Sequence, residues 1–272
     1  MTNTKNILQS NIIPINIPKL YKRKLYRYIP LKYVQSMIED KILTFVNPKL
    51  WNDPFERIYL ETDYSKLGYT RPNKVYCLCT RNSIDNEEAS WKVYSDGKEP
   101  LIRVELDIVH LFEQLETFAK QHNCNLYFAQ VDYTYKENEI RKELSTSPMF
   151  YNDFFSNFSE KSYVRLMSLK RPAFAYEKEF RLFVVPQLNS DISTMEDILQ
   201  VPIKYNMFRR FDICPCERIR EEDKNKWTLK VKKNQYQNMV LNIRKLIQSK
   251  IPSVTVMGSN LYKDVSPIKK IV

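Results

Sequence analysis

The strongest constraint on the fold is a segment near residue 180 in which polar and apolar side chains alternate. From Ala175 to Val185 the chain reads Ala-Tyr-Glu-Lys-Glu-Phe-Arg-Leu-Phe-Val-Val. Successive side chains of a β-strand point to opposite faces, so Glu177, Glu179 and Arg181 would share one face. The opposite, apolar face would carry Tyr176, Phe180, Leu182 and Val184. The pattern predicts a strand that holds two carboxylates and a guanidinium at a cleft, or a half-buried strand whose polar face meets water.

Length and composition favour a globular protein. The chain has 272 residues, of which 43% are apolar and 13% aromatic, enough to bury a substantial core. No apolar run approaches the roughly 18 residues that would suggest a membrane span. The first residues also lack the apolar core and small-residue cleavage site of a secretory signal. We therefore expect a cytoplasmic protein without a membrane segment.

The charge is strongly basic and concentrated locally. Forty-three Lys and Arg against 32 Asp and Glu give a net charge of +11. Residues 19–27 and 224–233 each hold five basic residues and no acidic one. Interleaved aromatic residues could stack on bases, so both runs are predicted to attract nucleic acid or an acidic protein surface. A strand edge protected by lysines explains the second run equally well.

Several common binding motifs are missing from the sequence. The chain has only three glycines and none lies in a glycine-rich loop, so Walker and Rossmann phosphate-binding motifs are excluded. Cys77 and Cys79, like Cys214 and Cys216, have Cys-x-Cys spacing, which is not the usual zinc-knuckle spacing. We expect no metal centre there, and we expect Cys77 and Cys79 to lie buried on one face of a strand.

Periodicity predicts a mixture of strands and helices. Strands are expected near 25–29, 44–46, 75–80, 101–106, 125–135, 175–185, 199–205, 211–214, 227–233 and 254–257. Helices are expected near 30–42, 87–94, 107–123, 136–170 and 235–249, the last capped by Asn234. This order predicts an α+β fold with mixed, largely antiparallel sheets and flanking helices. Residues 1–18 are predicted to form an N-terminal arm or edge segment. Residues 19–272 are predicted to form a single domain, with the strand-helix-strand part 199–260 packed on it.

Four segments carry a resemblance to a known family. They are Leu25-Tyr-Arg-Tyr28, Asn52-Asp-Pro-Phe-Glu56, Ser90-Trp-Lys-Val-Tyr-Ser-Asp-Gly97 and Tyr176-Glu-Lys-Glu-Phe-Arg181. In this order they resemble the prokaryotic family catalogued as domain of unknown function 2971, over residues 20–260. Val93 stands where the family commonly has histidine, and the usual tryptophan before the Glu-x-Glu strand is missing.

The order of these parts is also similar to that of ADP-ribosyltransferases. This resemblance implies a split-sheet fold and NAD as the substrate. It further implies that Glu179 is the catalytic glutamate, which stabilises the oxocarbenium-like charge as nicotinamide leaves. Glu177 would position or deprotonate the acceptor.

The resemblance also implies a set of NAD-binding residues. Arg27 would contact an NAD phosphate, and Tyr28, Trp91 or Tyr94 would stack on nicotinamide or adenine. Alternatively, Arg27 is an exposed basic residue, and Trp91 and Tyr94, three apart on a helix, belong to the core.

The Asn52–Glu56 segment has two readings as well. It is either a structural turn, or Asp53 and Glu56 face the cleft and hydrogen-bond ribose or Arg181. Arg181 would then lock Glu177 or Glu179 in a bidentate pair, which lowers the pKa of that carboxylate.

Three classes of function follow. The first is an ADP-ribosyltransferase-like enzyme that transfers ADP-ribose from NAD to a nucleic-acid or protein acceptor, as a toxin or anti-phage effector. The second is a metal-dependent nuclease in which Asp53, Glu56, Glu177 and Glu179 gather Mg²⁺. The third is a non-catalytic module that binds nucleic acid or protein.

Overall fold

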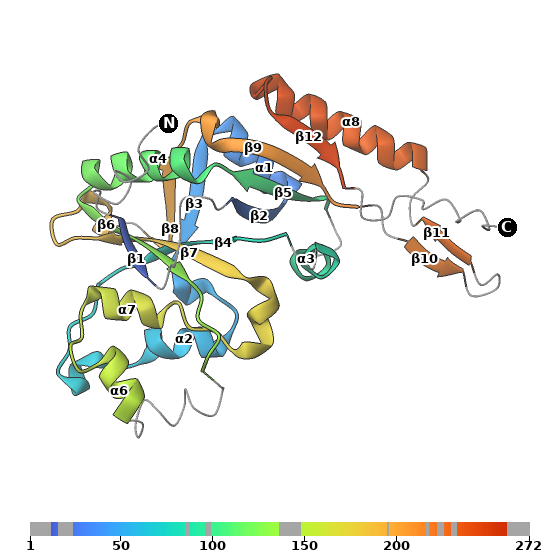
Figure 1. Ribbon diagram of the computed structural model, residues 1–272. Coiled ribbons are helices and arrows are strands. Elements are labelled where there is room, and N and C mark those ends of the chain that lie inside the picture. The colour runs from blue at the N-terminus through green and yellow to red at the C-terminus, as the bar shows by residue number, and fades with distance from the viewer. Residues whose placement is uncertain are drawn as a thin grey trace, which may run out of the picture. The chain divides into compact units, whose positions relative to one another are not determined.

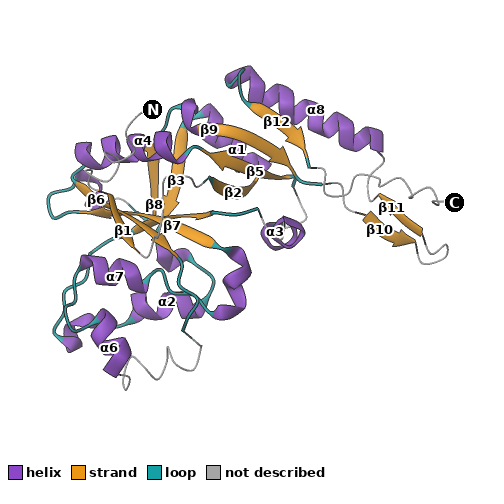
Figure 2. Cartoon of the chain, in the orientation of Figure 1, coloured by secondary structure: helices purple, strands orange, loops and turns teal. Residues whose placement is uncertain are grey.

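The computed structural model describes residues 12–15, 24–84, 87–95, 99–135, 148–194, 196–215, 218–221, 226–229 and 233–259. Over these residues the chain has the predicted α+β fold, with a mixed and largely antiparallel sheet (Figure 2). The chain divides into two compact units. Unit 1 comprises Met1–Tyr26, Lys41–Ile84 and Leu106–Met207, and unit 2 comprises Arg27–Asp40, Asp85–Glu105 and Phe208–Val272. That residues 19–272 act as one domain stays a prediction.

The sheet of unit 1 is built around the predicted charged strand. Its strands lie in the order β1 (Ile12–Ile15), β6 (Cys124–Gln130), β7 (Glu179–Pro186) and β4 (Tyr76–Arg81), while β3 (Ile42–Val46) pairs with β4 and β8 (Ile198–Pro202). β1 runs parallel to β6, and β7 is antiparallel to both of its neighbours. Seven successive residues of β7 are buried. The alternative that its polar face meets water is therefore wrong.

Helices cover both faces of this sheet (Figure 1). On one face lies α4 (Ile108–Gln121), whose Phe112 packs edge-on against Phe128 of β6 at 4.9 Å. On the other lie α2 (Pro54–Glu61), α6 (Pro148–Phe154) and α7 (Glu160–Leu166). Buried aromatic residues of these helices, including Tyr59 and Tyr163, pack with Phe183 of β7 in one cluster. Helices and their apolar side chains thus cover both faces of the sheet, which explains why β7 is buried.

Unit 2 has its own strands and helices. The strand order is β2 (Leu25–Pro30), β5 (Leu101–Leu106), β9 (Phe208–Ile213) and β12 (Thr255–Gly258), with β12 parallel to β9. The chain passes from unit 1 to unit 2 within β2. Its helices are α1 (Leu31–Glu39), α3 (Glu87–Tyr94) and α8 (Lys233–Lys250), and α8 lies along β12 (Figure 1). A hairpin of β10 (Arg218–Glu221) and β11 (Lys226–Leu229) completes the described part.

Short 3₁₀ helices link several elements. They are η2 (Pro48–Leu50), η3 (Tyr64–Leu67), η4 (Pro172–Glu177), η5 (Asp191–Thr194) and η6 (Tyr205–Met207). Within the described ranges, no helix has the length and apolar character needed to cross a bilayer.

The structure corrects four local predictions. Residues 175–177 belong to η4, so the charged strand begins only at Glu179. Ile42 lies in β3 and does not extend the face of α1, which ends at Glu39. α8 begins at Lys233, which places Asn234 inside the helix and not at its cap. Helix α2 and strand β10 were not predicted. The expected helical residues 136–147 and most of the expected arm 1–18 lie outside the described residues.

Candidate functional site

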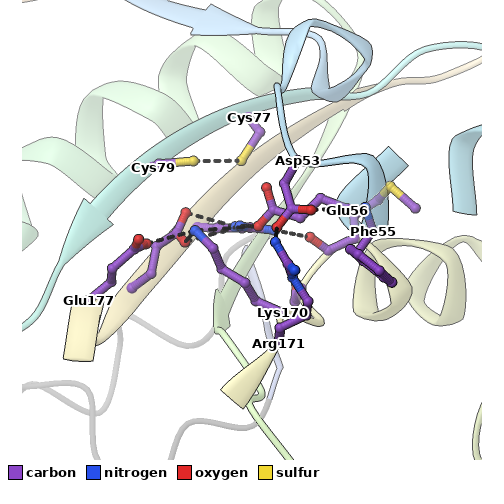
Figure 3. A network of polar contacts seen from close by, with 12 residues as sticks. Asp53, Phe55, Glu56, Cys77, Cys79, Lys170, Arg171 and Glu177 are labelled. Atoms are coloured by element: carbon purple, nitrogen blue, oxygen red, sulfur yellow. Dashed lines mark hydrogen bonds and ion pairs between the residues drawn. The ribbon is translucent and has the colours of Figure 1, made fainter. Parts of the chain in front are cut away.

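Five charged side chains meet in the interior of unit 1 (Figure 3). This charge network consists of Glu56, Lys170, Glu177, Glu179 and Arg181. The side chain of Lys170 is 11% exposed and the other four are less exposed still. Charged side chains stay buried only when they are paired and hydrogen-bonded, so the fold depends on the contacts within this network.

The start of α2 positions Glu56. Asp53 caps this helix, since its Oδ1 accepts the backbone N–H of Phe55 at 2.9 Å, and Pro54 occupies the first helical position. Glu56 falls in the first turn, where the helix dipole favours a carboxylate. Arg171 binds the other oxygen of Asp53 at 3.0 Å. The Asn52–Glu56 segment therefore begins a helix and also supplies an acid to the network.

Lys178 brings the two glutamates of the Glu-x-Glu motif together. Its backbone is left-handed, with φ 45° and ψ 49°, and it separates the end of η4 from the start of β7. Glu177 and Glu179 therefore do not share a strand face, contrary to the prediction. Both nevertheless reach Lys170, whose Nζ lies 2.7 Å from Glu177 Oε2 and 3.1 Å from Glu179 Oε2.

Arg181 lies at the centre of the network. It donates to Glu179 through Nε and Nη2 at 2.9 and 3.0 Å, to Glu56 Oε1 at 2.6 Å and to the Met167 carbonyl at 2.6 Å. Its guanidinium carbon also lies 4.2 Å from the ring centre of Trp51. The bidentate pair that the sequence suggested is thus formed with Glu179 and not with Glu177.

The two glutamates have opposite acid–base character. Burial opposes ionisation of Glu179, but the charges of Arg181 and Lys170 outweigh it and lower its pKa to about 2. Burial raises the pKa of Glu177, and the single ammonium of Lys170 does not compensate for it. Burial would lower the pKa of Lys170, yet the carboxylates of Glu179 and Glu56 raise it. Glu179 therefore stays ionised, while Glu177 takes up a proton more readily than a free glutamate.

The network contains one more carboxylate than cations. Three carboxylates face two cations, Lys170 and Arg181. Within the described part of the chain, Oε1 of Glu177 and Oε2 of Glu56 have no hydrogen-bond partner, whereas both oxygens of Glu179 are taken by cations. Glu177 and Glu56 are 6% and 7% exposed, so these two oxygens are unpaired inside the described fold.

Two thiols lie beside the network. As predicted, Cys77 and Cys79 share one face of β4, with their sulfur atoms 3.9 Å apart, and Cys77 is buried while Cys79 is half-buried. The hydrogen bond to Cys77, together with burial, raises the pKa of Cys79. Cys79 thus stays protonated beside the network.

Three of the predicted NAD-binding residues gather in unit 2. Tyr28 of β2 packs edge-on against Trp91 of α3 at 4.9 Å and stacks on Tyr94 at 5.4 Å. Tyr28 and Trp91 are 8% and 5% exposed, so they belong to a packed cluster, while Tyr94 is half-buried. Arg103 lies 5.7 Å from the Trp91 ring and forms an ion pair with Asp212 at 2.9 Å. The core alternative concerned Trp91 and Tyr94: Trp91 is buried, Tyr94 packs against the same cluster, and Tyr28 is buried in it as well.

The remaining predicted positions are scattered. Arg27 is half-buried on β2, and Asn52 is exposed just before the cap of α2. Lys170 and Arg171 were not predicted, although they tie Asp53, Glu177 and Glu179 together. They lie between elements, where no periodicity marks them. Of the two basic runs, backbone is described only for 24–27, 226–229 and 233, so their predicted role lies largely outside the described residues.

No protein-family model, curated protein or solved structure matches this chain. The resemblance drawn from the four sequence segments stays a prediction, and the chemistry must be argued from the charge network itself.

Proposed function

We propose that the chain is an ADP-ribosyltransferase-like enzyme that cleaves NAD and transfers ADP-ribose, with the charge network at the reacting centre. One observation carries this proposal: Glu177 and Glu179 lie on the same ammonium, and their pKa values are shifted in opposite directions. Environments that push two carboxyl pKa values apart characterise sites in which one acid stays charged and the other exchanges protons.

The charge balance suits this reaction. When the bond between nicotinamide and ribose breaks, the electron pair leaves with nicotinamide and positive charge develops on the ribose. The surplus carboxylate of the network would stabilise that charge, as fixed dipoles stabilise an oxyanion with the opposite sign. Burial shifts the pKa of Glu177 towards neutral pH, and a general base is most effective when its pKa lies near the working pH.

Each glutamate has a separate role in this proposal. Oε1 of Glu177 accepts no hydrogen bond from the described residues, so in this proposal Glu177 takes the proton that the acceptor hydroxyl or amine loses as its bond to the ribose forms. Both oxygens of Glu179 are held by Arg181 and Lys170, so Glu179 supplies negative charge and fixes these two cations. Glu56 adds the third carboxylate.

The remaining parts of the proposal come from the resemblance. Arg27 and Tyr94 are half-buried and remain the proposed contacts for NAD, whereas Tyr28 and Trp91 would support them from the core. The acceptor would be a nucleic acid or a protein drawn by the basic runs. Such an activity suits a toxin or an anti-phage effector that acts in the cytoplasm.

The donor set disfavours the metal-dependent nuclease. Glu56, Glu177 and Glu179 already have Lys170 or Arg181 at ion-pair distance, and Asp53 has Arg171. A magnesium ion would have to displace these cations from their carboxylates.

The test is nicotinamide release by the full chain incubated with NAD and candidate acceptors, with and without EDTA. We expect release that EDTA does not affect, and a loss of about 100-fold or more in Glu177→Gln, the scale of general-base catalysis. Glu160→Gln is the control, because Glu160 is also a hydrogen-bonded glutamate of unit 1, half-buried where Glu177 is buried, and lies outside the network. Full activity in Glu177→Gln would overturn the proposal. Cleavage of nucleic acid that requires a metal would favour the nuclease.

A further inference from the structure

Unit 1 contains a cleft of about 590 Å³ that is separate from the charge network. It is lined by residues of α2 and α7, by the segments before β4 and before β8, and by Asn47 and Lys49 in the segment after β3. No residue of the network is among them. Its volume falls within the range typical of small-molecule sites, about 300 to 1,000 Å³.

Helix α2 contributes residues to both the charge network and the cleft. Glu56 points into the network, and Arg57, the next residue, is turned by about 100° around the helix axis. Arg57, Leu60 and Glu61 are spaced three and four residues apart, so they share one helix face, and all three line the cleft. One face of α2 therefore contributes Glu56 to the buried network, and another contributes Arg57 and Glu61 to the cleft.

Three cations of the cleft have no counter-ion. Arg57, Arg71 and Lys74 line it, and none forms an ion pair within the described part of the chain. Nε of Arg57 is buried there without a hydrogen-bond partner. By contrast, Lys49 at the same cleft is neutralised by Asp197 at 2.6 Å. Arg57, Arg71 and Lys74 therefore bring positive charge to the cleft, which an anionic ligand would neutralise.

The other lining groups indicate what this anion is attached to. Nη1 of Arg71 donates to the Tyr163 hydroxyl at 3.2 Å, which leaves the hydroxyl proton available as a further donor. Glu61 and Glu196 are exposed at the cleft and can accept hydrogen bonds from sugar hydroxyls. Leu60 and buried Val75 offer apolar surface for a flat ring.

We propose that this cleft binds a nucleoside mono- or diphosphate, with its phosphate on Arg57, Arg71 and Lys74. Guanidinium groups suit phosphate because they donate two parallel hydrogen bonds. The proposal goes beyond NAD cleavage and does not rest on it, since the site shares no residue with the charge network.

The test is calorimetric titration of the full chain with ADP, and separately with inorganic pyrophosphate. We expect saturable binding of ADP that weakens about tenfold or more in Arg57→Gln and in Arg71→Gln, as loss of a charge-assisted hydrogen bond predicts. Lys66→Gln is the matched control, because Lys66 carries the same charge on an 82% exposed side chain that does not line the cleft. It should change the affinity by less than about twofold. Arg71 is exposed and its replacement removes one hydrogen bond, that to Tyr163, so the thermal midpoint should fall only slightly.

Several results would overturn the proposal. These are the absence of ADP binding, equal weakening in Lys66→Gln, or pyrophosphate binding as tightly as ADP, which would leave no role for the nucleoside. Tighter binding of a short single-stranded oligonucleotide through the same arginines would assign the cleft to a nucleic acid. Glu177→Gln should bind ADP normally, so failure of this proposal can be distinguished from failure of the proposed function.

Discussion

Each unit buries an arginine against a tryptophan, but the two arginines have different surroundings. Arg181 of unit 1 lies 4.2 Å from the ring centre of Trp51, and Arg103 of unit 2 lies 5.7 Å from that of Trp91. Their side chains are 1% and 8% exposed. Arg181 is shared by two carboxylates, whereas Asp212 is shared by two arginines, Arg103 and Arg210.

The difference concerns which charge is in excess. In unit 2 the carboxylate of Asp212 has a guanidinium on each oxygen, an arrangement that satisfies the acid completely. In the charge network of unit 1, three carboxylates face two cations, and the pKa of Glu177 is raised. Buried ion pairs often serve structure alone, so a perturbed acid beside a cation is the better indicator of chemistry.

The comparison predicts unequal losses of stability when each arginine is removed. Arg181→Met should lower the free energy of unfolding by about 3 to 5 kcal/mol, because Glu56 and Glu179 then keep only Lys170. Arg103→Met should cost less, about 1 to 3 kcal/mol, because Asp212 retains Arg210 at 2.6 Å. Urea unfolding measures both. Equal losses would show that the surplus of carboxylates has no energetic consequence.

The second prediction concerns acid. The pKa of Glu179 falls from 4.5 to about 2 on folding, so the unfolded chain binds more protons between these values. The contribution of Glu179 to stability is therefore complete above about pH 4.5 and is lost as the pH falls towards 2. At about 1.4 kcal/mol per pKa unit this amounts to roughly 3 kcal/mol. Unfolding curves at several pH values should show a flatter dependence in Glu179→Gln. An unchanged slope would mean that other carboxyls control acid unfolding.

Removal of Lys170 should have a smaller effect. Lys170→Met should cost about 2 kcal/mol, because Glu179 keeps its bidentate contact with Arg181. It should also raise the pKa of Glu177 further, since Lys170 is the cation that holds that carboxylate. A carbon-detected NMR titration of the Glu177 carboxyl measures this shift. A lowered pKa would contradict the assigned contacts.

The smallest expected effect is that of Glu177→Gln on stability. Because the pKa of Glu177 is raised, its charged form is disfavoured in the folded state, and a neutral amide should change the free energy of unfolding by less than about 1 kcal/mol. Urea unfolding at neutral pH checks this, with Glu179→Gln as the contrasting variant. A loss as large as that of Glu179→Gln would assign Glu177 to structure.

Local patterns predicted most of the fold. The bounds expected for β5 and α3, 101–106 and 87–94, match the structure because alternation or helical spacing is uninterrupted there. The path between η4 and β7 could not be predicted in the same way. Its turn depends on a left-handed Lys178, where glycine would have been the usual signal.

The site was predicted in part. Glu56, Glu177, Glu179 and Arg181 stood in recognisable motifs, but their contacts depend on packing between distant segments. Glu56 and Arg181, for example, are 125 residues apart. Lys170 lies outside every helix and strand, so no local pattern identified it. The cleft also escaped prediction, because five separate segments line it.

The parallel pairing of β1 with β6 has a consequence for how the chain behaves in concentrated solution. Among the described strands β1 is the last on its side of the sheet, with Ile12 opposite Leu126 and Ile15 opposite Ala129. A version of the protein cut after residue 15 would leave the outward amide and carbonyl groups of β6 unpaired. A border of that kind recruits extended peptide from other molecules, so shortening the chain at this end would favour self-association and aggregation.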